Sequence, residues 1–587
     1  MDSKQFKEAA TSAIDEIVSY YDTLPDRKVL SSVEPGYLRK LLPSGPPEKG
    51  ESWTEIQKDI EEKIVPGLTH WQHPNFMAFF PASSSFPGML GELYSAAFTA
   101  PAFNWICSPA VTELETVVLD WLAKLLNLPD CYLSTGEGGG VIQGSASEAI
   151  VTVMVAARDK YLRETTSHLS GEEQEDAIAH KRSKLVALGS DQAHSSTHKA
   201  ALIAGVRYKS VPTTLENNFA LTGAALLKTI NELKAKGLEP FYLTCNLGTT
   251  STCAVDDFCS ITSALRTAAP AGPGEIWVHV DAAYAGSALV CPEYHHLTAH
   301  FGSFHLRTAA PAGPGEIWVH VDAAYAGSAL VCPEYHHLTA HFGSFHSFDM
   351  NMHKWLLTNF DASCLFIRKR KDLIDALSVT PSYLRNEHSE SGLVTDYRDW
   401  QIPLGRRFRS LKIWFVMRTY GVEGMQAHIR RHVKLGDVFH DLVKKREDLF
   451  EVIGEPRFAL TTFTLKAKEG EDREEVNRIS KEVYETVNSG GVIYITSSVV
   501  GGIYILRVVS ANELAEEKYV LNAFDIIVKT TEEVRAGKLT NGSNGVNGVN
   551  GVKTVNGANG KVHHQQLVEE GGGKGLGEVT DANGLAK

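Results

Sequence analysis

Apolar and polar positions follow two different periods along this chain. Between residues 5 and 21, apolar side chains recur every three or four positions, and Pro25 follows, which predicts an amphipathic helix. From about residue 86 to 400, short apolar runs alternate with helical stretches. Examples of these runs are 185–188, 241–244, 317–321 and 364–367. This alternation predicts an α/β domain whose sheet is mainly parallel.

The pattern changes again in the last third of the chain. Longer helices and two strand candidates, 458–465 and 502–509, predict a smaller C-terminal α+β domain. We therefore divide the chain into an N-terminal helical segment, a large domain, a small domain and a tail, with bounds 1–85, 86–400, 401–536 and 537–587. The tail is rich in Gly and Asn and cannot bury enough apolar surface to offset its ordering entropy, so we expect it to be disordered.

One segment of the large domain occurs twice. Residues 265–305 and 306–346 are the same 41 residues, letter for letter. Repeat architectures contain three or more copies that have drifted apart, because each copy buries the face of its neighbour. Two identical copies indicate either a very recent tandem duplication or a gene-prediction error.

Composition narrows the class of protein. The apolar content of 43% is ordinary for a globular chain, and the net charge of −13 argues against nucleic acid or an anionic membrane as the main partner. The N-terminus predicts a polar helix without the apolar core of a signal peptide, and no apolar run reaches about 18 residues, so we expect neither a signal peptide nor a membrane span. Eight cysteines without a C-x-x-C pair predict free thiols and no metal site. We expect a cytoplasmic protein.

A glycine-rich run from Gly136 to Gly144 precedes Ser145, Ala146 and Ser147. Glycines let backbone N–H groups approach an anion, and a helix that begins at Ala146 would present its positive end to a phosphate. Ser145 and Glu148 also have the spacing of a capping box, so a simple helix cap is the alternative. No Gly-Lys-Ser/Thr follows, which excludes a P-loop.

An aspartate and a lysine carry the candidate chemistry. Asp322 ends a Val-His-Val-Asp strand, as Asp281 does in the first copy, and Lys354 follows in Asn351-Met-His353-Lys. Ligands collect at the carboxyl ends of parallel strands. A lysine among apolar neighbours offers a neutral amine, and a carboxylate stabilises a protonated ring nitrogen, which together suit pyridoxal phosphate (PLP). The alternatives are a helix cap for the aspartate and a surface charge for the lysine.

Taken in order, these segments resemble the aromatic-L-amino-acid decarboxylase family of PLP enzymes, group II and fold type I. The resemblance runs from about residue 5 to 535 when one repeat copy is left out. Its specific signatures are 32–39, 138–149, 190–196 and 401–412. One departure is Met352, which stands where the family usually has proline before His-Lys.

The resemblance implies roles for the residues around the cofactor. Ser145, Ala146, Ser147 and Asn351 would hold the phosphate. His194, in Ser-Asp-Gln-Ala-His, would stack on the ring, although a structural histidine is the alternative. Lys354, behind His353, would form the covalent link to the aldehyde, and Asp322 or Asp281 would contact the pyridine nitrogen. Ser251 matches a hydroxyl position near the cofactor.

The resemblance also implies a substrate pocket and a general acid. The residues that match the aromatic pocket are Trp71, Phe79, Phe80, Pro81, Phe103 and Gly405. Tyr383 matches a mobile-loop tyrosine that reprotonates the carbanion in the active site of the other subunit. We therefore expect a homodimer with shared active sites and a swapped N-terminal segment.

These features predict decarboxylation of an aromatic L-amino acid to its arylalkylamine and CO2. Gly405 and Phe79 favour tryptophan slightly over tyrosine and DOPA. An aromatic aldehyde synthase on the same scaffold is the first alternative, although Tyr383 and His194 favour simple decarboxylation. An inactive paralogue disabled by the duplication is the second.

The duplication raises the question of which aspartate serves the site. Asp322 lies 32 residues before Lys354 and Asp281 lies 73 before it, whereas the family separation is about thirty, so the second copy keeps the native link to the lysine. We expect the two copies to compete for one slot in the sheet. The first strand would then be expelled at the 270–274 loop and expose Ile276 and Trp277, so that the full chain is less soluble and less active than a chain with one copy.

Overall fold

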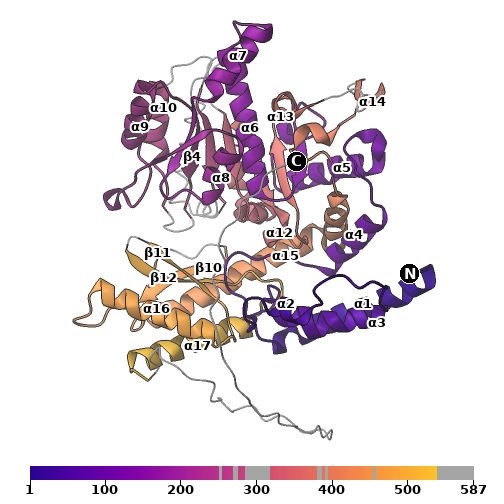
Figure 1. Ribbon diagram of the computed structural model, residues 1–587. Coiled ribbons are helices and arrows are strands. Elements are labelled where there is room, and N and C mark those ends of the chain that lie inside the picture. The colour runs from indigo at the N-terminus through magenta and orange to yellow at the C-terminus, as the bar shows by residue number, and fades with distance from the viewer. Residues whose placement is uncertain are drawn as a thin grey trace, which may run out of the picture. The chain divides into compact units, whose positions relative to one another are not determined.

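A computed structural model describes the protein. The described residues are 1–249, 254–268, 275–283, 318–340, 342–379, 387–390, 394–453, 458–500 and 502–538. The chain up to Thr540 forms one compact unit (Figure 1). Almost all of the tail that we expect to be disordered, from residue 539 onward, lies outside the described residues.

The predicted α/β sheet is confirmed and has eight strands in the order β1-β8-β7-β6-β5-β4-β2-β3. The pairs from β7 to β3 are parallel, and β8 is antiparallel to both β1 and β7. The central strands are buried along their length, as expected when helices cover both faces of a parallel sheet. The strands are β1 (Gly139–Gln143), β2 (Leu185–Ser190), β3 (Arg207–Val211), β4 (Glu239–Asn246), β5 (Trp277–Asp281), β6 (Val319–Asp322), β7 (Ser347–Asn351) and β8 (Ser363–Ile367).

Helices cover the two faces of this sheet. One face packs on α5 (Pro109–Leu125), α9 (Gly223–Ala235) and α10 (Phe258–Ala268). The other packs on α6 (Ala146–Thr165), α8 (Ser195–Ile203) and α13 (Lys371–Leu377). Figure 1 shows α9 and α10 side by side beyond β4. The remaining helices of this part of the chain are α4 (Phe86–Ala97), α7 (Gly171–Arg182), α12 (Met352–Trp355), α14 (Glu387–Glu390) and α15 (Arg409–Lys445).

The predicted C-terminal strands are also confirmed. They are two strands of a four-stranded antiparallel sheet with the order β11-β12-β10-β9. Its elements are β9 (Phe450–Val452), β10 (Leu460–Leu465), α16 (Arg473–Ser489), β11 (Thr496–Val500), β12 (Ile503–Val509) and α17 (Glu517–Arg535). None of the helices in the described ranges has the length and apolar character that a membrane span requires.

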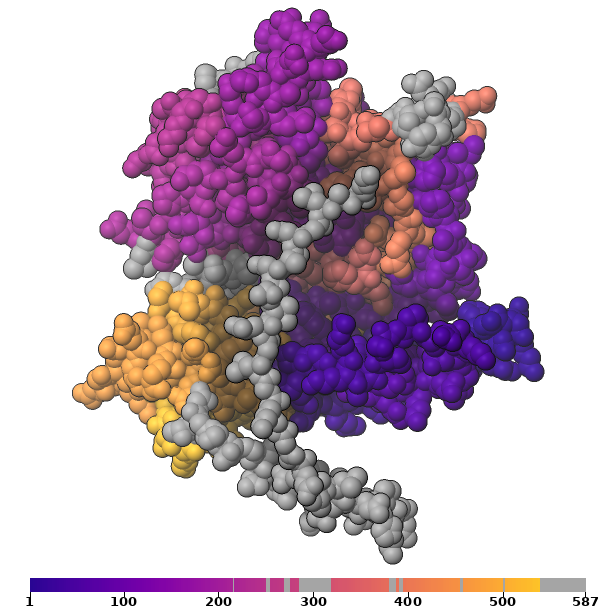
Figure 2. All heavy atoms as spheres, in the orientation of Figure 1, coloured from indigo at the N-terminus to yellow at the C-terminus, as the bar shows by residue number. Residues whose placement is uncertain are grey.

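The N-terminal segment contains the predicted first helix. Its helices are α1 (Ser3–Thr23), α2 (Tyr37–Leu41) and α3 (Trp53–Asp59). The N–H of Val29 donates to the carbonyl of Gly491 at 3.1 Å, and the N–H of Met77 donates to that of Tyr494 at 2.8 Å. Figure 2 shows this segment, in indigo, alongside the C-terminal elements in orange and yellow. Backbone hydrogen bonds therefore join the two ends of the compact unit.

The two copies of the repeated segment form neighbouring strands. β5 and β6 pair in parallel, and each residue lies opposite its own copy, from Val278 with Val319 to Asp281 with Asp322. The rings of Trp277 and Trp318 are 3.7 Å apart. The expectation that one strand is expelled is therefore wrong. A strand satisfies its edge N–H and C=O groups by pairing with its copy, so the sheet grows by one strand.

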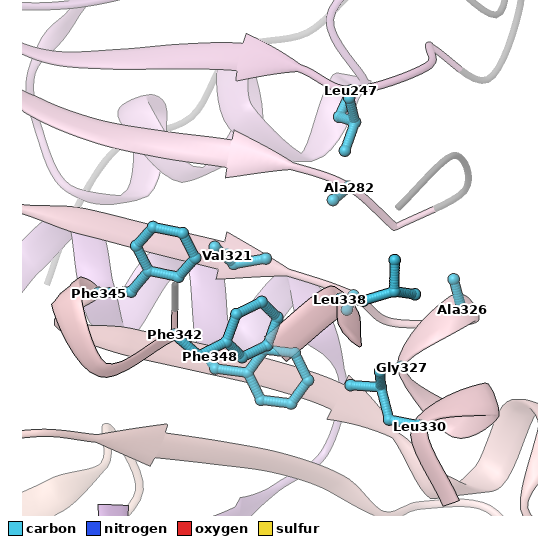
Figure 3. A pocket seen from close by; sticks show the side chains of 11 residues that line it. Leu247, Ala282, Val321, Ala326, Gly327, Leu330, Leu338, Phe342, Phe345 and Phe348 are labelled. Carbon is cyan, nitrogen blue, oxygen red and sulfur yellow. The ribbon is translucent and has the colours of Figure 1, made fainter. Parts of the chain in front are cut away.

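The expected exposure of the first copy is wrong for the same reason. Ile276, Trp277 and Val278 are all buried. A cavity of about 30 Å³ remains beneath the ends of the paired strands, and Figure 3 shows Leu247, Ala282 and Val321 on its strand side. At about 24 cal/mol per Å³, a void of this size costs only about 0.7 kcal/mol. Packing alone gives little reason for the sheet to reject the second copy.

A buried ion pair holds the end of β1 in place. The guanidinium of Arg406 donates to both carboxylate oxygens of Glu115, on α5, at 2.6 and 2.7 Å. The same carboxylate accepts the N–H of Ile142 at 2.9 Å, and Arg406 donates to the Ile142 carbonyl at 3.1 Å. Both side chains are almost fully buried. The pair thereby joins the 401–406 segment to the strand that leads into Ser145.

We predict that Arg406→Met lowers the free energy of unfolding by about 3–5 kcal/mol, because it leaves the Glu115 carboxylate buried without its partner. Denaturant titration measures this change. Arg418→Met is the matched control: that arginine is exposed over the ring of Trp414, and its loss should cost about 1 kcal/mol or less. Equal effects of the two substitutions would contradict the structural role of Arg406.

Candidate active site

The turn between β1 and α6 is the candidate phosphate site. The Oγ of Ser145 accepts the N–H of Glu148 at 3.3 Å and caps the helix, while the Glu148 carboxylate accepts the N–H of Gly144 at 2.8 Å. The alternative of a helix cap is therefore present, although the carboxylate reaches Gly144 instead of the backbone of Ser145. The first-turn N–H groups of α6, at Ala146 and Ser147, have no carbonyl partner within the helix and suit an anion.

Most glycines of the run before this turn have another role. Gly139 and Gly140 belong to β1, so the cradle predicted from Gly136 onward narrows to the turn at Gly144. A Cβ on Gly138 would lie 2.1 Å from the carbonyl oxygen of Cys131 and 2.6 Å from that of Ile367. A Cβ on Gly140 would lie 3.0 Å from the ring of Phe366. These two glycines permit close packing around β1.

Three aspartates form one row across the central strands: Asp281 and Asp322 end β5 and β6, and Asp349 lies within β7. In register, Asp281 lies beside Asp322, which lies beside Asp349 on β7. The carboxylate of Asp322 accepts the N–H of Ala324 at 2.9 Å, and that of Asp281 accepts the N–H of Ala283 at 3.2 Å. Burial raises the pKa of Asp322, and the neighbouring carboxyl groups of Asp349 and Asp281 raise it further.

Lys354 is the cation that faces this row. Burial lowers the pKa of its amine, whereas the charges of Asp322, Asp349 and Asp281 oppose that shift. Its backbone carbonyl accepts the hydroxyl of Ser83 at 3.0 Å. A lysine in such a site is able to serve as a neutral nucleophile. The arrangement thus joins a reactive amine to a set of acids.

His353, which precedes the lysine, holds the local backbone. Its Nδ1 accepts the N–H of Ala362 at 2.9 Å, and its carbonyl accepts the N–H of Ser83 at 2.7 Å. Burial, together with the charge of Lys354, lowers the pKa of this imidazole to about 3. Asn351, at the end of β7, is also buried, and its Oδ1 has no hydrogen-bond partner among the described residues.

The residue after the lysine is anchored from α15. The indole of Trp355 donates to Nδ1 of His432 at 3.0 Å. The ring of His428 lies 4.3 Å from that of His432 in an edge-on arrangement. Burial, and to a smaller extent the charge of Arg431, lower the pKa of His428 to about 3. These neutral rings fix the short helix α12, which carries Lys354.

His194 lies at the start of α8, after β2. Its Nδ1 accepts the N–H of Ser196 at 3.3 Å and lies 2.7 Å from the Ser196 hydroxyl, so the ring caps this helix. The side chain is exposed and its charge acts on Asp281. His194 therefore follows a strand on the β4 side of the repeated strands, and the aspartate on which its charge acts is the first copy.

The residues expected in the aromatic pocket fall into separate groups. Phe80 belongs with the lysine, because its ring stacks on Tyr325 at 4.1 Å and lies 5.9 Å from the amine of Lys354. Pro81 follows it in the chain. Trp71 stacks on Phe79 at 5.7 Å, near the C-terminal sheet. Phe103 and Gly405 form a third group. The carbonyl of Phe103 accepts the N–H of Arg398, and the nearby carbonyl of Pro101 accepts the N–H of Arg406, the residue after Gly405.

Ser251 and Tyr383 lie outside the described residues. Sequence reasoning missed Asp349 and Tyr325. The hydroxyl of Tyr325 donates to the carbonyl of Phe458 at 2.7 Å. The signal for Asp349 was its place two residues before Asn351 in a buried strand, on the same face of the sheet.

Known proteins share these features. The model of the pyridoxal-dependent decarboxylase conserved domain matches residues 35–305 and 305–466, two parts that meet where the repeat copies meet. Tyrosine decarboxylase 2 of Narcissus pseudonarcissus is 40% identical over 542 residues, which cover 92% of this chain and 96% of that protein. Phenylacetaldehyde synthase of Arabidopsis thaliana is 41% identical over 530 residues, covering 90% and 96%. The crystal structure of Oryza sativa TDC with PLP and tryptamine has a TM-score of 0.76 and 36% identity, covering 91% and 99%.

This chain belongs to the pyridoxal-dependent decarboxylase family, and the expected family resemblance and fold are confirmed. It is a PLP-dependent decarboxylase. The residues fit PLP. The start of α6 suits the phosphate, and the aspartate row suits a protonated ring nitrogen.

We predict that His428→Gln reduces the loss of stability in acid. A group whose pKa is lower in the folded state stabilises the fold above its unfolded pKa, about 6.5 for histidine, and that stability is lost as the pH falls towards 3. For one histidine this amounts to about 2 kcal/mol between pH 8 and pH 5. The measurement is the urea midpoint at both pH values, with His180→Gln, exposed on α7, as the control. If the urea midpoint changed equally with pH in the native chain and in both variants, His428 would be shown to take up a proton in the folded state.

Proposed function

We propose that this enzyme converts an aromatic L-amino acid to its arylalkylamine and CO2, with tryptophan preferred over tyrosine and DOPA. The observation that carries the proposal is the amine of Lys354, which faces a row of three carboxyl groups on neighbouring parallel strands, of which those of Asp322 and Asp349 are buried. Its relatives support an aromatic substrate, because they include a tyrosine decarboxylase and a crystal structure of Catharanthus roseus tryptophan decarboxylase in complex with L-tryptophan.

The residues of the chain divide the work of the reaction. The first turn of α6, with Ser145, Ala146 and Ser147, binds the phosphate together with Asn351. Lys354 supplies the amine that holds the aldehyde carbon, and the carboxyl of Asp322 holds the proton on the ring nitrogen. PLP supplies an electron sink for the pair of electrons left when CO2 departs. Tyr383 then donates its phenolic proton to the substrate carbon from which CO2 has left.

Phe80 provides an apolar wall beside the amine, and its stacking on Tyr325 holds its ring in place. We propose that Trp71, Phe79, Pro81, Phe103 and Gly405 complete the aromatic pocket in a homodimer with shared sites. Exposed apolar side chains on α4 support a dimer, because such a surface is costly in a monomer. They are Phe86, Leu90, Leu93 and Tyr94. We further propose that the segment 1–85 is exchanged between the subunits and that the enzyme is cytoplasmic.

An aromatic aldehyde synthase is the second candidate, and the 41% identity to phenylacetaldehyde synthase favours it. The tyrosine at position 383 favours the amine product instead. Release of hydrogen peroxide and ammonia in stoichiometric amounts with CO2 would identify the synthase. An amine without peroxide supports the decarboxylase.

We predict that Lys354→Ala abolishes the covalent link to PLP and lowers kcat by roughly 10³-fold or more. Borohydride reduction of the enzyme with PLP, followed by peptide mapping, should place the label on the peptide that contains residue 354. Lys371→Ala, an exposed lysine on α13, should keep both the label and the activity. A label on another peptide in folded protein would refute the proposed function.

We predict a higher kcat/KM for tryptophan than for tyrosine, and a shift of roughly tenfold towards tyrosine in Gly405→Ser, because the hydroxyl adds a partner for a phenol. A Cβ at Gly405 meets no atom within 4 Å, so the substitution fits this chain without strain. Steady-state kinetics with both substrates provide the measurement. A native enzyme that prefers tyrosine by tenfold or more would overturn the assignment.

A further inference from the structure

The repeated strand lies in the middle of the candidate site. In the order β2-β4-β5-β6-β7, copy one continues from β4 and copy two leads to β7. A chain with a single copy has one strand between β4 and β7, whereas this chain has two. Neighbouring strands lie about 4.8 Å apart, so the second copy adds about that distance between the two sides of the site.

The site residues divide between these two sides. His194 follows β2, and its charge acts on Asp281, the first copy. On the other side, Asn351 ends β7 and Lys354 follows it, while the turn at Ser145 follows β1, which pairs with β8. Asp322 pairs with β7 and therefore belongs to the side that carries the amine and the phosphate turn.

We infer that the duplication divides the cofactor site, so that Asp322 serves the PLP ring nitrogen while His194 is withdrawn from the ring by one strand. This inference rests on the proposed function. A cofactor held by its phosphate and by the amine of Lys354 is fixed on the β7 side. Ring stacking requires carbon atoms about 3.5–4.0 Å apart, and an added strand spacing exceeds that tolerance. Asp322 keeps its native relation to Lys354 because the segment between them is undisturbed.

Asp281 is then a surplus acid. It adds a third carboxyl group to the row. The charge of Lys354 acts on all three, and that of His320 acts on Asp281 and Asp322. Like charges in a buried row disfavour one another, so the row retains protons that a pair would release. No group of three such side chains in the described ranges is placed to hold a metal ion that could offset this charge. Asp281 therefore opposes a negative charge on Asp322 instead of assisting it.

The two copies allow a test with a common reference. Deletion of 265–305 and deletion of 306–346 produce the same chain of 546 residues (587 − 41), because the copies are identical. The dissociation constant of PLP is measured by absorbance titration of the apoprotein for the full and the one-copy chain. We expect the full chain to bind PLP at least tenfold more weakly. His194→Ala should weaken binding at least fivefold more in the one-copy chain than in the full chain.

A matched pair of substitutions in the full chain tests the aspartates without a deletion. Asp322→Asn should weaken PLP binding at least tenfold more than Asp281→Asn and should alter the visible spectrum of the bound cofactor. Both asparagines retain an oxygen that accepts the N–H two residues on, so both variants keep this turn. Circular dichroism and the denaturant midpoint verify that each variant folds.

The outcomes separate the two hypotheses. A greater effect of Asp281→Asn, or an equal effect of His194→Ala in the two chains, would overturn the divided site and leave the proposed function intact. Equal affinity of the full and one-copy chains would do the same. If neither chain bound PLP through Lys354, the proposed function would fall, and this inference with it.

Discussion

Parallel pairing of β5, β6 and β7 places Asp281, Asp322 and Asp349 in one row that faces the amine of Lys354. A buried amine keeps its charge only where acids stand close to it, and buried acids keep theirs only beside a cation. Each group therefore determines the protonation of the others. The remaining contacts of the site maintain these distances between the amine and the carboxyl groups, because they hold the strands in register and the short helix α12 in place.

Two side-chain pairs hold the elements of the site in place. The ion pair between Arg406 and Glu115 ties the end of β1 to the 401–406 segment, so the phosphate turn begins at a fixed place. On the other side, Trp355 donates to His432 and anchors the residue that follows Lys354. Neither pair touches the row of acids. Both act by limiting the movement of the elements that carry it.

Sequence reasoning reached most of the fold because the evidence for it is local. Continuous apolar runs predicted the buried strands, and helical spacing predicted α1. It failed where a residue has two possible uses. Gly138 and Gly140 suggested a phosphate cradle, but they allow backbone and side chains to pack closely around β1. Sequence reasoning also failed to predict that both copies of the repeated strand enter the sheet, because a strand with a free edge is able to pair with its own copy.

The sequence by itself determined the family, the candidate lysine and the existence of two equivalent aspartates, because each is contained in a short run of residues. Only the tertiary structure decided that both aspartates occupy the sheet, that Asp349 joins them, and that the charge of His194 acts on the first copy. The physical reason is that hydrogen bonding between strands depends on which edges meet, and a chain with two identical strands leaves that choice to packing and register.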